Sequence, residues 1–102
     1  MTKQFLYVLR LTPGFQVESG WTDADRAMVG MHFERLAQAT QAGQVVLAGR
    51  TAEPLDRTFG LVVFEAENED AARRFMEGDP AVQAGIMQAT LHPYDIVLLR
   101  KQ

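Results

Sequence analysis

The sequence contains no cysteine, which excludes disulfide bonds, thiolate metal ligands and cysteine nucleophiles. Its only two histidines, His32 and His92, are sixty residues apart, and a pair without close spacing does not indicate a metal site. The sequence also lacks a glycine-rich phosphate loop, a nucleophile elbow, and any flavin, nicotinamide or haem motif. We therefore expect neither a metal nor a cofactor.

An excess of basic charge is absent as well. The net charge is -3 at pH 7, whereas nucleic-acid binding normally requires clustered lysine and arginine. No apolar run approaches the roughly 20 residues that a membrane-spanning helix needs, and the N-terminal segment has no cleavage site typical of a secretory signal. We expect a cytoplasmic protein without nucleic-acid or membrane partners.

What is present is typical of one globular domain. The 102 residues are 47% apolar and 23% charged, which is enough to build a single core, so we assign residues 1–102 to one domain. Apolar periodicity and turn residues predict strands at 4–12, 45–48, 58–65 and 87–100, the last interrupted near His92 by Pro93 so that 94–100 forms the final strand. They predict helices at 22–42 and 68–77, and a short helical turn from Asp79 to Gly85.

The order of these elements is β-α-β-β-α-β. It predicts an α+β, ferredoxin-like fold, with a four-stranded antiparallel sheet and two helices on one face. Residues 4–12 and 45–48 are apolar on both parities, so we place them as a central and an inner strand. No helix is left to cover the second face of the sheet. We therefore predict a homodimer that packs sheet against sheet, and leave open whether it assembles further.

His32 lies on the apolar stripe of the first helix, which we expect to be buried: Met28, Val29, His32, Phe33, Leu36, Ala39 and Thr40. Arg35 is expected on the opposite, outer face. An imidazole in such a stripe is either a core group bonded to a polar partner or a base that faces a pocket. Asp79 is the candidate partner. Before Pro80 it is an ordinary N-cap, but its carboxylate could also orient the imidazole.

At these positions the sequence resembles a known family. The sequence is similar to the YCII-related family at His32, in the eleven-residue step to Gly43, at Ala48-Gly49 in VVLAGR, and at Asp79-Pro80 and Ala84-Gly85 in GDPAVQAG. The resemblance covers nearly the whole chain. It implies a ferredoxin-like fold that dimerises as an α+β barrel, related in architecture to muconolactone isomerases, with a cleft whose His–Asp pair corresponds to His32 and Asp79. One member type is described as a dehydrochlorinase, and most members have no assigned reaction.

The chain differs from shorter members in its longer 13–22 loop, which carries Trp21, and in Arg50, where many members have proline. Arg50 is either a solvated end-of-strand residue or a ligand for a substrate carboxylate. Tyr7 and Trp21 complete the candidate substrate-binding set, although Tyr7 also fits the core. Long loops often cover sites.

Three functions remain open. The first is a small enzyme without a cofactor, in which a His32–Asp79 dyad moves a proton during isomerisation, elimination or lactone chemistry on a small organic acid. The second is a non-catalytic dimer that binds or senses a small ligand. The third is a structural dimer in which His32 belongs to the core. Fold alone does not choose among them.

Overall fold

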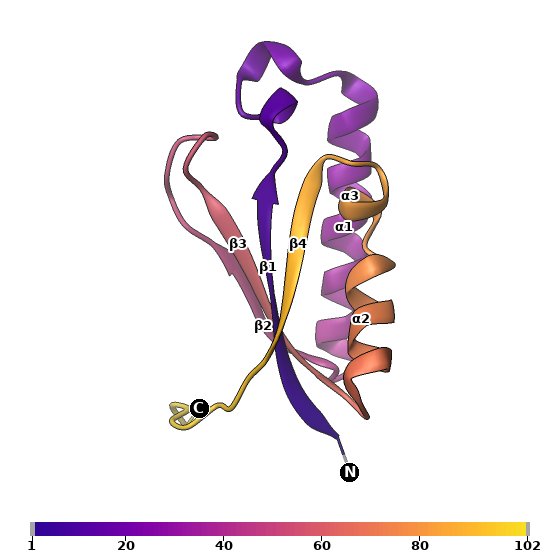
Figure 1. Ribbon diagram of the computed structural model, residues 1–102, viewed down its shortest axis with the longest axis vertical. Coiled ribbons are helices and arrows are strands. Elements are labelled where there is room, and N and C mark those ends of the chain that lie inside the picture. Colours follow the sequence, from indigo (N-terminus) through magenta and orange to yellow (C-terminus); the bar gives the residue numbers. More distant parts are fainter. Residues whose placement is uncertain (1, 102) are drawn as a thin grey trace.

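The computed structural model describes residues 2–101, and its centre is a four-stranded antiparallel sheet (Figure 1). The strands are β1 (Lys3–Leu11), β2 (Val45–Arg50), β3 (Phe59–Ala66) and β4 (Met87–Pro93), arranged in the order β2-β3-β1-β4. Helix α1 (Asp23–Gln41) connects β1 to β2, and α2 (Glu69–Glu77) and the short α3 (Pro80–Gln83) lie between β3 and β4. The predicted α+β, ferredoxin-like order is confirmed, with β1 as a central strand.

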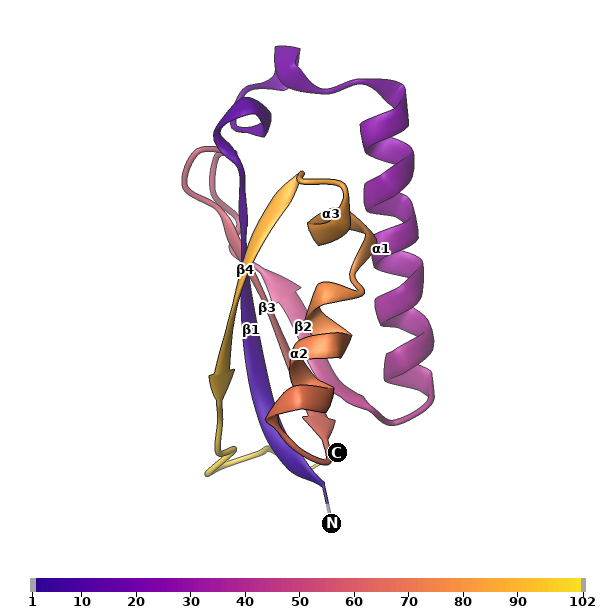
Figure 2. The same cartoon turned by 45° about the vertical axis from the view of Figure 1, so that its right-hand side comes forward.

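All three helices lie on one side of the sheet, as the two views show (Figures 1 and 2). The segment between β1 and α1 forms two short 3₁₀ turns, η1 (Pro13–Phe15) and η2 (Glu18–Gly20), beyond the end of the sheet. We call the side that carries the helices the helix face of the sheet, and the other side its open face. No helix within residues 2–101 has the length and hydropathy needed to cross a membrane.

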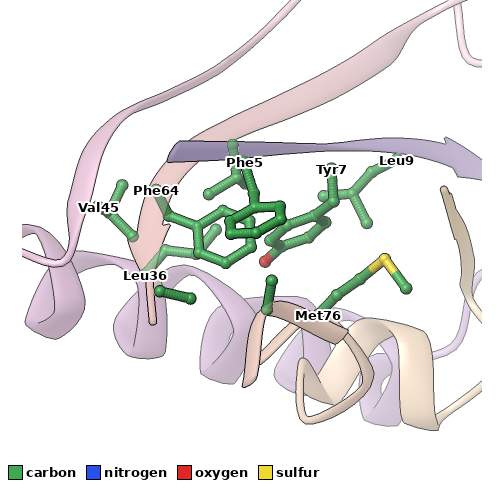
Figure 3. Close-up of a cluster of buried hydrophobic side chains, with 10 residues drawn as sticks. Phe5, Tyr7, Leu9, Leu36, Val45, Phe64 and Met76 are labelled. Carbon is green, nitrogen blue, oxygen red and sulfur yellow. The ribbon is translucent and has the colours of Figure 1, made fainter. Parts of the chain in front are cut away.

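The core lies between the helix face and the helices (Figure 3). Alternate residues of β1 point into it, because successive side chains of a strand point to opposite faces. Tyr7 and Phe64 are the largest of the completely buried side chains, and they pack edge to face with ring centroids 5.6 Å apart. The core is made of Phe5, Tyr7, Leu9, Leu36, Val45, Val62, Phe64, Ala66, Ala72 and Met76.

Local capping signals in the sequence define the helix ends. Thr22 and Asp25 form a reciprocal capping box at the start of α1, and Asn68 caps α2 by accepting from the backbone of Ala71. Helix α1 ends before Gly43, which has φ +89°, a left-handed conformation that glycine adopts without strain. The predicted helix boundaries are therefore confirmed to within a residue or two.

Two predictions about strands are wrong. Strand β2 is at an edge of the sheet rather than inside it, and its second half is exposed. Residues 94–100 form no strand, because the chain leaves the sheet after Pro93. β4 instead occupies Met87–Pro93 and pairs with β1 along its whole length, from Leu11↔Met87 to Phe5↔Pro93.

The predicted stripe on α1 is only partly buried. Leu36 is buried, whereas Phe33 is 69% exposed and Thr40 is also exposed. The reason is that both residues border a cavity between α1 and the sheet instead of packing into the core. Arg35 was expected on the outer face, but it is partly buried, with its guanidinium 4.5 Å from the centre of the Phe75 ring on α2.

Candidate active site

Asp79 sits at the break between α2 and α3. Pro80 at the first position of α3 fixes a helical φ, and Asp79 caps the helix by accepting a hydrogen bond from the Ala81 backbone N–H to Oδ1, at 3.0 Å. Its side chain is completely buried. A buried carboxylate needs several donors to remain charged, and a four-residue helix supplies only one of them.

His32 supplies the second donor from the middle of α1. Its Nδ1 lies 2.7 Å from Oδ1 and 2.8 Å from Oδ2 of Asp79, across 47 residues of sequence. The contact is possible because α3 packs directly against α1. The predicted pairing of His32 with Asp79 is therefore present as a short hydrogen-bonded contact.

Tyr7 supplies the third donor from β1. Its hydroxyl donates to Oδ2 of Asp79 at 2.8 Å, while its ring is enclosed by Phe64 and Phe75. Burial, and then the negative charge of Asp79 and the hydrogen bond to it, raise the pKa of the Tyr7 phenol far above its ordinary value. Tyr7 therefore acts as a neutral donor that holds the carboxylate in place.

These donors decide the charge of Asp79. Burial alone would raise the pKa of its carboxyl group, but the hydrogen bonds from His32, Tyr7 and Ala81, together with the charge that His32 can carry, outweigh burial and lower the pKa below 3.8. Asp79 is consequently an anion at neutral pH. An anionic acceptor at Nδ1 favours the tautomer in which that nitrogen carries the proton.

The same tautomer leaves the lone pair of His32 on Nε2. No hydrogen bond to Nε2 is present among residues 2–101, and the His32 side chain, which is 13% exposed, lines a cavity of about 760 Å³. The cavity lies between α1 and the helix face of β1, β2 and β3, and Trp21 and the loop after β2 also border it. His32 thus joins a buried anion on one side to an accessible space on the other.

The wall of the cavity is mainly apolar. Its polar side chains come from His32, Thr40, Gln41, Arg50 and Thr58, and none of its lining residues is acidic. The remaining lining residues are Leu9, Leu11, Trp21, Val29, Phe33, Leu36, Ala37, Leu47, Ala48, Gly49, Leu55, Phe59, Gly60, Leu61, Val62 and Met87. A wall of this kind is typical of pockets for ligands with an apolar body and few polar groups.

Of the four other candidate residues, two line the cavity and two do not. Arg50 and Trp21 both line the cavity; the Trp21 indole donates to the Phe15 carbonyl at 2.9 Å and is thereby held at one end. Tyr7 is not in the wall, because its hydroxyl is occupied by Asp79. His92 is on the open face, opposite Leu6 of β1, and its Nε2 contacts Thr90 at 3.0 Å.

Sequence reasoning missed two neighbours of the dyad. Tyr7 was assigned only to the core or to the substrate; the available signal was that a tyrosine on the buried parity of a strand needs an acceptor for its hydroxyl. Arg35 follows His32 by three residues and so shares its side of α1. Its positive charge opposes the rise in the pKa of Tyr7. Among residues 2–101, no cluster of three or more histidine, aspartate or glutamate side chains could hold a metal ion.

Comparisons with known proteins agree with this architecture. Residues 5–91 match the model of the YCII-related domain. A similar solved structure is that of 5-chloro-2-hydroxyhydroquinone dehydrochlorinase from Burkholderia phenoliruptrix AC1100, in complex with 2,5-dihydroxybenzoquinone. It is 19% identical with a TM-score of 0.59, and the match covers 90% of this chain and 93% of that one. No curated protein matches the sequence. Since the domain match covers most of its length, the chain belongs to the YCII-related family.

Proposed function

We propose that this protein is a small-molecule enzyme in which His32 and Asp79 move a proton on an organic acid. The observation that carries the proposal is the position of the imidazole. Its Nδ1 lies within 2.8 Å of both oxygens of a buried carboxylate, and the same ring borders a cavity of about 760 Å³. A histidine oriented in this way is suited to act as a general base through its other nitrogen.

In the proposed step, Nε2 of His32 takes a proton from a substrate carbon next to a carbonyl, or from an acidic hydroxyl. The electron pair left on the substrate forms a double bond and delocalises onto the carbonyl oxygen. In an elimination, a leaving group departs with its bonding electrons; in an isomerisation, His32 returns the proton to another carbon. The positive charge that develops on the imidazole is balanced by Asp79, which Tyr7 holds in place.

The wall of the cavity favours a substrate with an apolar body and one acidic group. Arg50 offers paired N–H donors to a carboxylate or enolate, and Trp21 offers an aromatic surface at one end of the cavity. We expect Arg50 to hold the acidic group while His32, which lines the same cavity, deprotonates a neighbouring carbon.

The similar solved structure suggests which reaction to try first. Its name describes a dehydrochlorinase, and it contains a dihydroxybenzoquinone. Loss of hydrogen chloride from a chlorinated ring needs a base for the proton and a route for chloride to leave, which is the elimination described above. We propose eliminations on ring-sized acidic compounds as the first reactions to test, followed by isomerisations and lactone reactions.

The proposal includes a homodimer that packs through the open faces of the two sheets. The centre of this face is apolar, because Leu6 and Val8 of β1 lie beside Leu61 of β3, and all three side chains are partly exposed. A soluble protein rarely leaves such a surface in water, and a second copy related by a two-fold axis would cover both faces at once. Sedimentation equilibrium measures this dimer directly.

Deuterium exchange tests the chemistry without a prior choice of leaving group. Candidate acids are incubated with the protein in D₂O, and NMR detects loss of the proton next to the carbonyl. We expect His32→Gln to lower the exchange rate by roughly 10²- to 10⁴-fold, and Asp79→Asn to lower it as well. Arg74→Gln is the control, because Arg74 is exposed on α2, outside both the cavity wall and the open face, and this variant should exchange at the wild-type rate.

Binding is followed separately through Trp21, the only tryptophan, whose fluorescence should change when the cavity fills. If acids bind but neither wild type nor variant exchanges a proton, the protein is a binding module. If both dyad variants instead lose their folded structure, the dyad is structural. A wild-type exchange rate in His32→Gln contradicts the proposed base.

A further inference from the structure

Arg35 is a partly buried charge whose own contacts do not account for it. Its guanidinium lies 4.5 Å from the centre of the Phe75 ring, and its Nη1 is buried. Within residues 2–101, Nη1 has no hydrogen-bond partner, and no carboxylate forms an ion pair with this side chain. A guanidinium remains charged at any pH a protein meets, and burying a charge without a partner is unfavourable. An unsatisfied group of this kind needs an explanation.

The guanidinium lies at the turn that carries Asp79. A Cβ built on Gly78 would come within 2.8 Å of Nη2 of Arg35, so the guanidinium uses the space that this glycine leaves free. Gly78 ends α2 and directly precedes Asp79. Helix α1 runs beside this turn in both views (Figures 1 and 2). The positive charge of Arg35 is thereby placed next to the residue that precedes the buried carboxylate.

Arg35 and His32 are three residues apart on α1, and residues at this spacing are neighbours on a helix surface. The charge of Arg35 also acts on the hydroxyl that holds the carboxylate, because it lowers the pKa of Tyr7 against the larger effect of burial. Asp79 is the only buried charged residue among residues 2–101. Arg35 is therefore a permanent positive charge close to the one buried negative charge of the described chain.

Burial distinguishes Arg35 from the other cations. Within residues 2–101 it is the one lysine or arginine that is partly buried, and Arg50, which lines the same cavity as His32, is exposed. Exposed charges are screened by water and salt far more than partly buried ones. The charged side chains of α2 are exposed as well: Glu69, Asp70, Arg73, Arg74 and Glu77. Since Tyr7 is neutral, the weakly screened charges around His32 are those of Asp79 and Arg35.

We propose that Arg35 keeps His32 available as a base by supplying the positive charge that balances Asp79. The carboxylate is then compensated without a second proton on the imidazole, and the lone pair on Nε2 stays free to accept a proton from the substrate. Without Arg35, Asp79 draws that second proton to His32. Arg35 acts through His32, because it is not in the cavity wall. The inference rests on the proposed function, but the charge balance is measured without a substrate.

NMR titration of the histidine ring protons tests this balance. The chain has only two histidines, and His92, exposed on the open face, is the internal reference. Arg35→Met keeps a long side chain over Phe75 but removes the charge. We expect it to raise the titration midpoint of His32 by about one pH unit, because a nearby positive charge no longer opposes protonation. Arg35→Lys retains the charge and should titrate like wild type.

Gly78→Ala moves the charge instead of removing it. The added Cβ displaces the flexible end of Arg35, while the φ of -79° at this position suits alanine. We expect a smaller upward shift of the His32 midpoint. Arg73→Met is the matched control, because it removes the same charge from an exposed position of α2, and both midpoints should stay unchanged. In the D₂O exchange assay, the rising limb of the pH profile of Arg35→Met should move upward with the His32 midpoint, and its rate should reach the wild-type value at high pH.

A His32 midpoint that is unchanged or lowered in folded Arg35→Met overturns the inference. Equal shifts in Arg35→Met and Arg35→Lys also overturn it, because packing rather than charge then causes them. If circular dichroism shows that Arg35→Met does not fold, Gly78→Ala decides: an upward shift supports the charge balance, and an unshifted midpoint overturns it. If the midpoints move as expected but no acid exchanges a proton in any form, the charge balance stands and the proposed function fails.

Discussion

Asp79 and the C-terminal arm differ in how many contacts they make with residues that are distant in the sequence. Asp79 is completely buried and receives hydrogen bonds from α1, from β1 and from its own helix, all within one chain. The arm, residues 94–101, has three exposed apolar side chains, and within residues 2–101 its hydrogen bonds to the body of the protein all go to Gln4. Asp79 therefore makes many contacts with distant elements of its own chain, whereas the arm makes few. Substitutions at Asp79 should accordingly change stability far more than substitutions in the arm.

The largest expected effect on stability is that of Asp79→Ala. The substitution removes the cap of α3 and leaves the Tyr7 hydroxyl and His32 Nδ1 without their acceptor, and buried donors that lose a partner cost about 1–3 kcal/mol each. We expect the free energy of unfolding to fall by roughly 3 kcal/mol or more, measured by urea denaturation. Asp56→Ala, in an exposed turn, should change it by less than about 0.5 kcal/mol. Equal effects at the two positions would contradict the contrast.

Acid should remove the charge-dependent part of this effect. The pKa of Asp79 is below 3.8 in the folded protein, so the unfolded chain binds the proton more readily. The stabilisation is therefore fully present above about pH 5 and decreases as the pH falls through 4 toward the folded pKa. Urea denaturation of wild type and Asp79→Asn should give a difference that shrinks on acidification. For the control Asp56→Asn, the difference in the free energy of unfolding from wild type should remain close to zero at every pH. If the difference for Asp79→Asn instead grows on acidification, the pKa of Asp79 is not lowered in the folded protein.

Tyr7→Phe should have a smaller effect, because phenylalanine keeps the packing against Phe64 and Phe75 and only the hydroxyl is lost. Asp79 still accepts from His32 and Ala81. We expect the free energy of unfolding to fall by about 1–2 kcal/mol, and proton exchange on a substrate to slow less than in His32→Gln. Tyr94→Phe, at a half-exposed position at the base of the arm, is the control and should be neutral. An unchanged stability in Tyr7→Phe would show that its hydrogen bond does not support the carboxylate.

The sequence was informative wherever a few adjacent residues determine the structure. The helix starts at residue 22 and at the Asp79–Pro80 step were both predicted, and in the structure contacts within three residues set each of them, through a capping box in the case of Thr22. His32 was a useful signal because an imidazole in an apolar stripe requires a partner. The choice of Asp79 as that partner followed from the family resemblance as well as from spacing, since it depends on how α3 packs against α1.

What the sequence did not reveal depends on tertiary contacts. Tyr7 reaches Asp79 only because β1 lies in the centre of the sheet beneath α3, and Arg35 is partly buried only because α2 brings Phe75 beneath it. The apolar residues of the arm have strand propensity, but propensity does not supply a neighbouring strand, so the strand predicted at 94–100 is absent. Likewise, four apolar residues at 45–48 cannot distinguish an inner strand from an edge strand.

The smallest predicted effect concerns Gly30, in the middle of α1. Its position is exposed, and within residues 2–101 a Cβ added there would meet no atom within 4 Å, so no close packing in this part of the chain requires a glycine. Gly30→Ala should therefore raise the free energy of unfolding by up to about 1 kcal/mol. Gly43→Ala should have the opposite effect. Gly43 also has free space around its Cα, but its φ of +89° is strained for alanine, so the substitution should be destabilising. Urea denaturation measures both variants, and a Gly30→Ala protein that is less stable than wild type would contradict the free space at this position.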